Sequence, residues 1–276
     1  AADGLCDIQR ALGEDAAARG GRVVLATTTH FLPFGGMPLV TSGDMRELTR
    51  ALDGRGLACV GTPTADDLGR LAAPAMPLEE LAGAADLLVV EADGSKRLPL
   101  KAHASHEPVV PACADLTACV VGASGFGGLV GERVHRAALL CERVGCDVYD
   151  TATPELVARG MADEMARGLI APDVIVVNQA EMPDRAAAAR RFAAALRELG
   201  CETPVLLGSV RDERLVRACT GDRHPFQKEM GLPAVMAQEA RQERGASKPL
   251  HERSCLDLVH DGEVLFLDAR IDGARE

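Results

Sequence analysis

The segment LLVVEADGSKRLPLKAHASH, residues 87–106, decides the fold class, because four apolar residues run directly into a cluster of charged ones. A near-continuous apolar run is typical of a strand in a parallel sheet that helices cover on both faces. In such sheets, ligands bind at the carboxyl edge, where the strands end. Glu91, Asp93 and Lys96 follow this strand, so we predict that they lie at a binding site.

Similar apolar runs recur along the chain, and segments with helical spacing separate them. The runs are residues 22–28, 57–62, 87–92, 118–124, 174–178 and 204–209. One separating segment, residues 184–200, ends in a glycine, which is a helix-ending signal. The alternation predicts an α/β fold with a mostly parallel sheet and helices on both faces. We expect these strands to be neighbours in one sheet: 22–28, 87–92, 118–123, 174–178 and 204–208.

The composition argues against several classes of partner. The chain has 276 residues, of which 47% are hydrophobic, so it can bury a full core. Its 41 acidic and 30 basic residues give a net charge of −11, which argues against binding nucleic acid or an anionic membrane. Aromatic residues make up 3%, too few for base-stacking platforms. We therefore expect no nucleic-acid partner and no membrane partner.

The cysteines and the apolar runs indicate a compartment. The nine cysteines form no CxxC pair, and most lie in or beside apolar runs, where a reduced thiol acts as a small core residue. The chain shows no signal peptide, and no apolar run approaches the ~20 residues of a membrane span. These patterns predict a reduced, cytoplasmic protein.

Polar residues gather after other strands of the predicted sheet as well. Thr27, Thr28, Thr29 and His30 follow the first run, glycine-rich residues 122–128 follow the fourth, and Asn178, Gln179 and Glu181 follow the fifth. Each cluster alone also fits a structural role. Threonines favour strands and helix caps, EADGS fits an ordinary turn, and ASGFGG fits a flexible loop. His30, His103, His106 and His135 also fit surface or capping positions. Their joint placement at one edge favours a functional site.

These motifs, in this order, resemble a known family. TTTH at 27–30, VVEADGSKRLPLKAHASHEPVVP at 89–111, VHR at 134–136 and VVNQAE ending at Glu181 are similar to the YqeC family. Its members are described as accessory proteins for selenium-dependent molybdenum hydroxylases. The resemblance covers roughly residues 5–217. It implies a P-loop NTPase-like, three-layer α/β domain over residues 1–220, and a role in maturing the selenium-containing cofactor.

The resemblance also implies roles for single residues. Glu91, Asp93 and Lys96 would be catalytic, and the two carboxylates would hold Mg²⁺ with ATP or GTP. The residues implied to bind the nucleotide are Thr27, Thr28, Thr29, His30, Asn178, Gln179 and Glu181. The residues implied to bind a second substrate or an anion are Lys101, His106, His135 and Arg136.

One departure from the family pattern bears directly on catalysis. The family carries a GxGGK[ST] phosphate loop before TTTH, but here no lysine precedes Lys96, and residues 4–23 read GLCDIQRALGEDAAARGGRV. Either the protein lacks the loop and is a binding scaffold, or the numbered chain omits a segment near Gly13. We expect the second case, with a short helix at residues 7–12 and a break in the chain between Leu12 and Ala17.

Residues 221–276 lie outside the resemblance. They include two predicted strands joined by His-Asp-Gly, and we expect an appendage with a possible β-hairpin or a contact between copies in a homo-oligomer. For the whole protein we expect a nucleotide-dependent accessory factor that works with a selenium-dependent molybdenum hydroxylase or its maturation proteins. Two alternatives remain open: a non-catalytic nucleotide-sensing or partner-binding module, and an ATP-dependent carboxylate ligase.

Overall fold

The structure, a computed structural model, describes residues 4–66, 68–210 and 214–218. The fold is mixed α/β with mostly parallel strands, as predicted. All six predicted apolar runs form strands, and the predicted helix at 184–200 is present as α7 (Pro183–Glu198). The appendage predicted for 221–276 lies outside the described residues.

The first sheet belongs to the N-terminal half of the chain. Its strands, in order, are β3 (Leu39–Val40), β4 (Leu57–Val60), β1 (Val23–Thr27) and β7 (Leu87–Glu91), all parallel. Successive residues of β1 point to opposite faces, so Val24 packs with α2 (Met45–Arg55) and α3 (Leu78–Ala84), while Val23 packs with α1 (Gly4–Ala18). The sheet therefore lies between two helical layers.

The second sheet belongs to the C-terminal half. Its strands, in order, are β13 (Arg214–Arg217), β12 (Val205–Ser209), β11 (Val174–Asn178) and β9 (Ala118–Gly122). β9, β11 and β12 are parallel, and β13 pairs antiparallel with β12. A second apolar core covers one face of this sheet, and it includes residues of α5 (Ala137–Val144), α6 (Pro154–Ala166) and α7.

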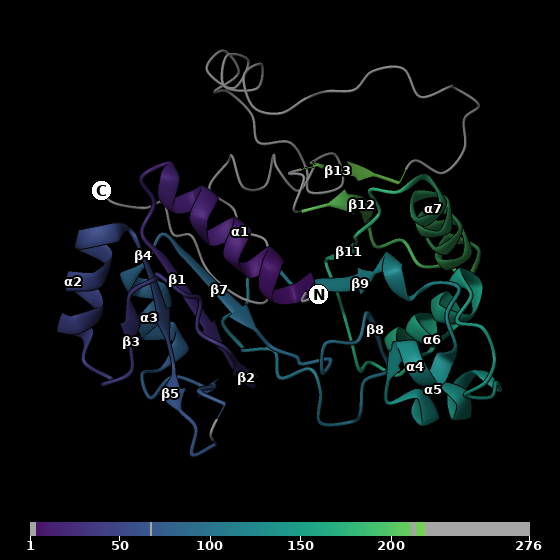
Figure 1. Cartoon of the computed structure of the whole chain (residues 1–276), viewed down its shortest axis with the longest axis horizontal. Helices are drawn as coiled ribbons and strands as arrows, with labels where there is room; N and C mark the ends of the chain where they lie inside the picture. Colours follow the sequence, from purple (N-terminus) through teal and green to yellow (C-terminus); the bar gives the residue numbers. More distant parts are fainter. Residues whose placement is uncertain (1–3, 67, 211–213, 219–276) are drawn as a thin grey trace, which may run out of the picture.

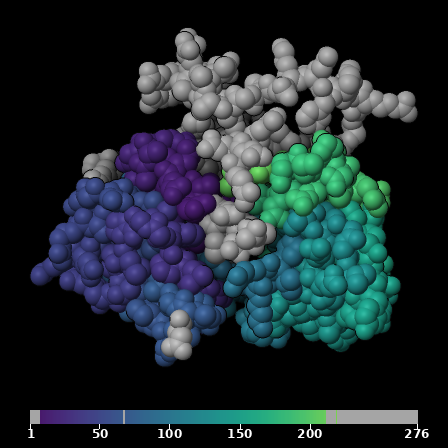
Figure 2. All heavy atoms as spheres, viewed as in Figure 1, coloured from purple at the N-terminus to yellow at the C-terminus, as the bar shows by residue number. Residues whose placement is uncertain are grey.

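The prediction of a single sheet is wrong. β7 ends the first sheet and β9 ends the second, and within the described ranges no ladder joins them. One apolar core nevertheless spans both sheets, because Val89 of β7, Ala118 of β9 and Ile8 of α1 belong to the same cluster. Figure 1 shows α1 running diagonally between the purple-to-blue half and the teal-to-green half, and Figure 2 shows these halves as two lobes.

Helix α1 is one uninterrupted helix from Gly4 to Ala18, so the predicted break between Leu12 and Ala17 is wrong. The apolar residues Ile8, Leu12 and Ala16 recur every fourth residue and pack in the same core. This apolar stripe stabilises a continuous helix across the position of the expected break. The amide of the buried Gln9 donates to Ala26 O at 2.8 Å and to Val89 O at 3.0 Å, which ties α1 to β1 and β7. The described residues thus place a helix where the family pattern would begin its phosphate loop.

Shorter elements complete the described chain. β2 (His30–Phe31), β6 (Leu71–Ala72) and β5 (Thr62–Pro63) form a small antiparallel sheet, and β8 (Leu100–Lys101) pairs with β10 (Val134–His135). The 3₁₀ helix Ala123–Gly125 and α4 (Val130–Arg133) connect β9 to β10. Among the helices that the structure describes, none has the length and apolar character to cross a bilayer.

Candidate functional site

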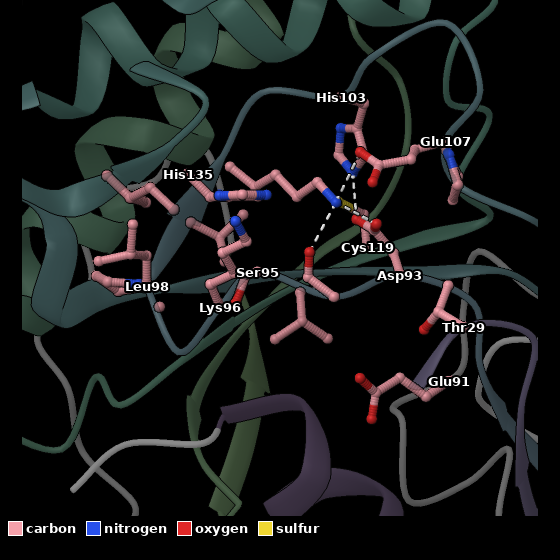
Figure 3. Close-up of a pocket in the computed structure, with 18 of the residues that line it drawn as sticks. Thr29, Glu91, Asp93, Ser95, Lys96, Leu98, His103, Glu107, Cys119 and His135 are labelled. Carbon is pink, nitrogen blue, oxygen red and sulfur yellow. Dashed lines mark hydrogen bonds and ion pairs between the residues drawn. The ribbon is translucent and has the colours of Figure 1, made fainter. Parts of the chain in front are cut away.

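A cavity of about 1230 Å³ collects the carboxyl ends of strands from both sheets. Its wall includes Glu91 at the end of β7, Gly122 at the end of β9 and Gln179 just after β11. Small-molecule sites usually measure ~300–1,000 Å³, so the cavity has room for a nucleotide and a second molecule. Figure 3 shows charged side chains gathered along its wall.

Asp93 and Lys101 form the centre of the charged wall. The Lys101 ammonium pairs with Asp93 Oδ1 and also donates to Gly94 O at 2.8 Å, and 7% of its side chain is exposed. Asp93 lies in the segment that joins β7 to β8, which the sequence placed at the carboxyl edge, and Lys101 is the last residue of β8. A buried ammonium requires a counterion, so the pair holds this segment in one conformation.

Glu107 extends the pair across the cavity. Its carboxylate lies 2.9 Å from Lys101 Nζ and 2.6 Å from Arg136 Nη2. Burial opposes ionisation of Glu107, but hydrogen bonds and charges from Lys101 and Arg136 outweigh it and lower the pKa of the carboxyl. Lys101 and Arg136, which the sequence assigned to a second substrate or anion, both line the cavity, and both pair with carboxylates.

His103 lies between two carboxylates. Its Nε2 is 3.0 Å from Asp93 Oδ2, and its Nδ1 is 2.6 Å from Glu164 Oε2. Burial alone would lower the pKa of the imidazole, but the hydrogen bonds to Asp93 and Glu164, with their charges, outweigh it and raise this pKa to about 9. His103 is therefore an imidazolium at neutral pH, and a cation faces each oxygen of Asp93.

Glu164 brings α6 into the charged cluster. Its Oε1 accepts from His103 N at 2.8 Å and from Arg143 Nη1 at 2.7 Å. Arg143 of α5 also donates to His103 O at 2.6 Å. The sequence reasoning did not single out Glu164 or Arg143. The available signal is that Glu164 follows Val157 and Met161 on the buried face of α6, where an acid needs partners.

Cys119 of β9 lines the same part of the cavity, and Figure 3 shows it beside Asp93. Burial raises the pKa of this thiol to about 12, and the negative charges of Glu164 and Asp93 add to the rise. Thiolates, not thiols, are the nucleophilic form of cysteine. Cys119 is therefore a wall residue and not a nucleophile at neutral pH.

Residues 27–30, which were predicted to bind the nucleotide, divide into two that line the cavity and two that do not. The Thr27 hydroxyl donates to Glu91 O at 2.8 Å, and the Thr28 hydroxyl donates to Val109 O at 2.7 Å, so both hold the backbone around β7. Thr29 and His30 line the cavity, whereas Thr27 and Thr28 are not among its lining residues. The structure thus brings half of this predicted group to the site.

Of the three predicted residues at the end of β11 and after it, only one lines the cavity. Gln179 lines the cavity and its side-chain oxygen accepts from the Ser124 hydroxyl. Asn178 is buried and accepts from Val210 N at 3.0 Å, which fixes the segment after β12. Glu181 lies 3.5 Å from Arg185, one helical turn along the chain, and both side chains are more than a third exposed. Only Gln179 of these three belongs to the cavity wall.

Some of the remaining predicted basic residues line the cavity and others do not. Lys96 and His135 line the cavity, whereas 72% of the His106 side chain is exposed and it is not part of the wall. Burial lowers the pKa of His135, and the positive charges of Lys101, Arg136 and Lys96 lower it further. This part of the wall therefore carries positive potential.

The fit of a magnesium ion depends on the two acids after β7. The described residues contain no group of three or more His, Cys, Asp or Glu side chains that could hold a metal. Asp93 does not fit as a ligand in this arrangement, because both of its oxygens face cations. Glu91 lines the cavity and fits better, since Mg²⁺ on nucleotides usually takes one or two carboxylates besides phosphate oxygens. The metal roles of Glu91 and Asp93 stay predictions.

Comparison with known proteins places the first half of the chain. The family described as "YqeC protein" matches residues 8–138, a range that holds Glu91, Asp93, Lys101, His103 and Glu107. The protein YqeC of Escherichia coli (strain K12) is 32% identical over 130 residues, which are 45% of this chain and 51% of that protein. The match thus spans about half the length of this relative. No solved structure matches the chain.

Proposed function

Since residues 8–138 match the YqeC family and are similar to YqeC of Escherichia coli, we propose that this chain is a nucleotide-dependent accessory factor in the maturation of the selenium and molybdenum cofactor of selenium-dependent hydroxylases. The family resemblance supplies the biological setting. The cavity supports the binding part of the proposal. Its partners would be ATP or GTP with Mg²⁺, and the hydroxylase or its maturation proteins.

The single observation that carries the proposal is the convergence of charged and polar residues at the carboxyl ends of β7 and β11. Glu91, Lys96 and Gln179 come from both sheets and line one cavity of about 1230 Å³. In open α/β sheets, this edge is where ligands bind. A carboxylate could share Mg²⁺ with phosphate oxygens, and lysines could neutralise the remaining phosphate charge.

The structure favours ligand binding over autonomous hydrolysis within this proposal. α1 continues without interruption to Ala18, and the described chain before Lys96 contains no lysine that could reach a phosphate. His103 is already protonated and Lys101 is already paired, so neither side chain is a ready base at neutral pH. The carboxylate-ligase alternative, which a lysine and a histidine after the acidic end of β7 suggested, therefore has less support than the binding module.

Calorimetric titration with ATP and GTP, with and without Mg²⁺, tests the proposal. We expect one of the nucleotides to bind in a Mg²⁺-dependent manner, and Glu91→Gln to remove the Mg²⁺ dependence. Glu79→Gln on α3 is the matched control, because Glu79 is exposed and does not line the cavity. No binding of either nucleotide would refute the proposal. Hydrolysis measured with and without the hydroxylase would then separate an enzyme from a binding module.

A further inference from the structure

A second feature of the cavity wall is unusual backbone geometry. Four non-glycine residues among those described have positive φ: Lys96 at 50°, Arg97 at 64°, Arg136 at 62° and Gln179 at 63°. All four line the same cavity, although they come from three separate segments of the chain. Such residues are uncommon, because the backbone is strained in this region. Strained positions of this kind cluster at ligand sites.

Lys96 and Arg97 are consecutive and form the centre of one turn. Leu98 N donates to Ser95 O at 3.0 Å, and both central residues have positive φ, which is the pattern of a type I′ turn. This turn strongly prefers Asn-Gly or other small residues at its centre. A turn needed only to reverse the chain would favour those residues, so the two long cationic side chains require another explanation.

Neighbouring contacts hold the turn in place on both sides. Before it, Gly94 O accepts from Lys101 Nζ at 2.8 Å. After it, Pro99 O accepts from Gly122 N at 2.8 Å, and a Cβ on Gly122 would lie 2.8 Å from Pro99 Cβ. The glycine at the end of β9 thus allows close packing against the segment after the turn. The turn is therefore held in place by contacts with Lys101 of β8 and with the carboxyl end of β9.

The charges of the turn differ from those of the neighbouring cations. Lys101 and Arg136 are paired with carboxylates, whereas no carboxylate in the described part of the chain lies within ion-pair distance of Lys96 or Arg97. Both side chains are exposed at the cavity wall. Lys96 is also among the positive charges that, after burial, Lys101 and Arg136, lower the pKa of His135 on the same wall.

We propose that the Ser95–Leu98 turn is a recognition site for the phosphate groups of an anionic ligand, with Lys96 and Arg97 as the binding cations. This inference rests on the proposed function, since it names the part of the cavity that would receive the polyphosphate. Arg97 is new to the site. The strained backbone of the turn fixes the positions from which the two cationic side chains extend. Phosphate oxygens of the ligand would act as the counterions for Lys96 and Arg97, since no described carboxylate does so.

The test replaces the turn centre with the residues that its backbone prefers. Lys96→Asn with Arg97→Gly removes two charges and relieves strain, so we expect a higher midpoint of urea unfolding together with weaker binding. The probe is inorganic tripolyphosphate, measured by calorimetry. Because a charged hydrogen bond contributes about 1.5–3 kcal/mol, the affinity should fall by about tenfold or more. ATP and adenosine are titrated in parallel, to separate recognition of the phosphates from recognition of the nucleoside.

Two further variants make the result specific. Lys96→Gln with Arg97→Gln removes the charges without the favoured turn residues, and we expect weak binding with no gain in stability. Arg46→Gln with Arg50→Gln removes the same charge from α2, whose residues do not line the cavity, and we expect unchanged binding.

Unchanged tripolyphosphate affinity in the Asn-Gly variant would overturn the inference, and so would an equal loss in the α2 variant or no binding by the unmodified protein. If ATP binds equally well to all variants, the nucleotide proposal stands and the turn proposal falls. If tripolyphosphate binds in a turn-dependent way and ATP gains nothing over it, the turn proposal stands and nucleotide specificity falls.

Discussion

Replacing Glu164 with glutamine tests whether the charged cluster determines stability. Glu164 accepts from His103 N, His103 Nδ1 and Arg143 Nη1 at 2.6–2.8 Å, and 3% of its side chain is exposed. Glutamine has nearly the same shape, but it removes the charge and turns an NH₂ group toward donors. Removing one partner from a buried ion pair costs about 3–5 kcal/mol, because the other charge stays buried. We expect a loss of this size at pH 7.

Glu155→Gln is the matched control on the same helix. Glu155 makes two hydrogen bonds of 2.8 Å to Arg191, but its side chain is 45% exposed. Exposed pairs contribute about 0–1 kcal/mol, so this variant should lose little stability. The protein has no tryptophan and one tyrosine, so urea unfolding is best followed by far-ultraviolet circular dichroism.

The pH dependence gives an independent check. The pKa of His103 is raised from its ordinary 6.5 to about 9 in the folded protein. The contribution of protonated His103 to the free energy of unfolding is therefore fully present below pH 6.5 and is lost as the pH rises through 9. The rise in pKa corresponds to a contribution of about 3 kcal/mol. Glu164→Gln should reduce the fall in the free energy of unfolding between pH 6.5 and 9. The cysteine thiols titrate in both proteins, so their effect cancels when the variant is compared with the unmodified protein. Equal losses for both glutamine variants, or a decline that Glu164→Gln leaves unchanged, would refute the reasoning.

Three further predictions concern single residues. A Cβ on Gly13 would lie 2.9 Å from Leu25 Cδ2, so Gly13→Val should lower the free energy of unfolding by about 1–3 kcal/mol in urea titrations, and a neutral result would contradict the packing of α1 on β1. Asp93→Asn removes one of the two carboxylates on His103, so the pKa of this imidazole, followed by proton NMR, should fall below about 9, and an unchanged pKa would exclude the pairing. Cys119, whose pKa is raised to about 12, should react with iodoacetamide at pH 8 far more slowly than the exposed thiols of the urea-unfolded protein, as peptide mass spectrometry would show, and equal rates would contradict its environment.

Local pattern predicted the elements better than their pairing. The run at 87–92 is apolar at four of the five positions that β7 buries, Glu91 being the exception, so its strand character is present in its own sequence. Whether β7 pairs with β9 depends on what else can lie between them, and neither run carries that information. The break predicted in α1 had a similar cause, because the missing phosphate loop was inferred from a family pattern while the residues at 8, 12 and 16 kept a helical repeat.

In the candidate site, too, the sequence predicted residues near a strand end better than it predicted contacts between distant segments. Asp93 and Lys96 could be placed at a sheet edge because they follow β7 closely in the sequence. Glu164 is 61 residues from His103 and lies on a helix, so no motif connects them. Asn178 shows the opposite error: its position after a strand predicted a ligand contact, but its amide oxygen accepts a backbone hydrogen bond from Val210. A polar residue at a strand end serves the ligand or the fold, and only its contacts separate the two roles.

The pairing of charges also limits the chemistry that Lys101 and His103 can perform. Lys101 is held by Asp93 and Glu107, and His103 by Asp93 and Glu164, so these five buried ionisable groups satisfy one another. A general base must be unprotonated and within reach of the proton that it accepts, and an imidazole with a pKa near 9 fails the first condition at pH 7. The cations of the Ser95–Leu98 turn remain available to a ligand, in a protein whose net charge is −11. A cationic turn on an acidic protein concentrates anions at one place. Lys101 and His103 therefore shape and charge the cavity wall, and in the proposed function they would orient a phosphorylated ligand rather than accept its protons.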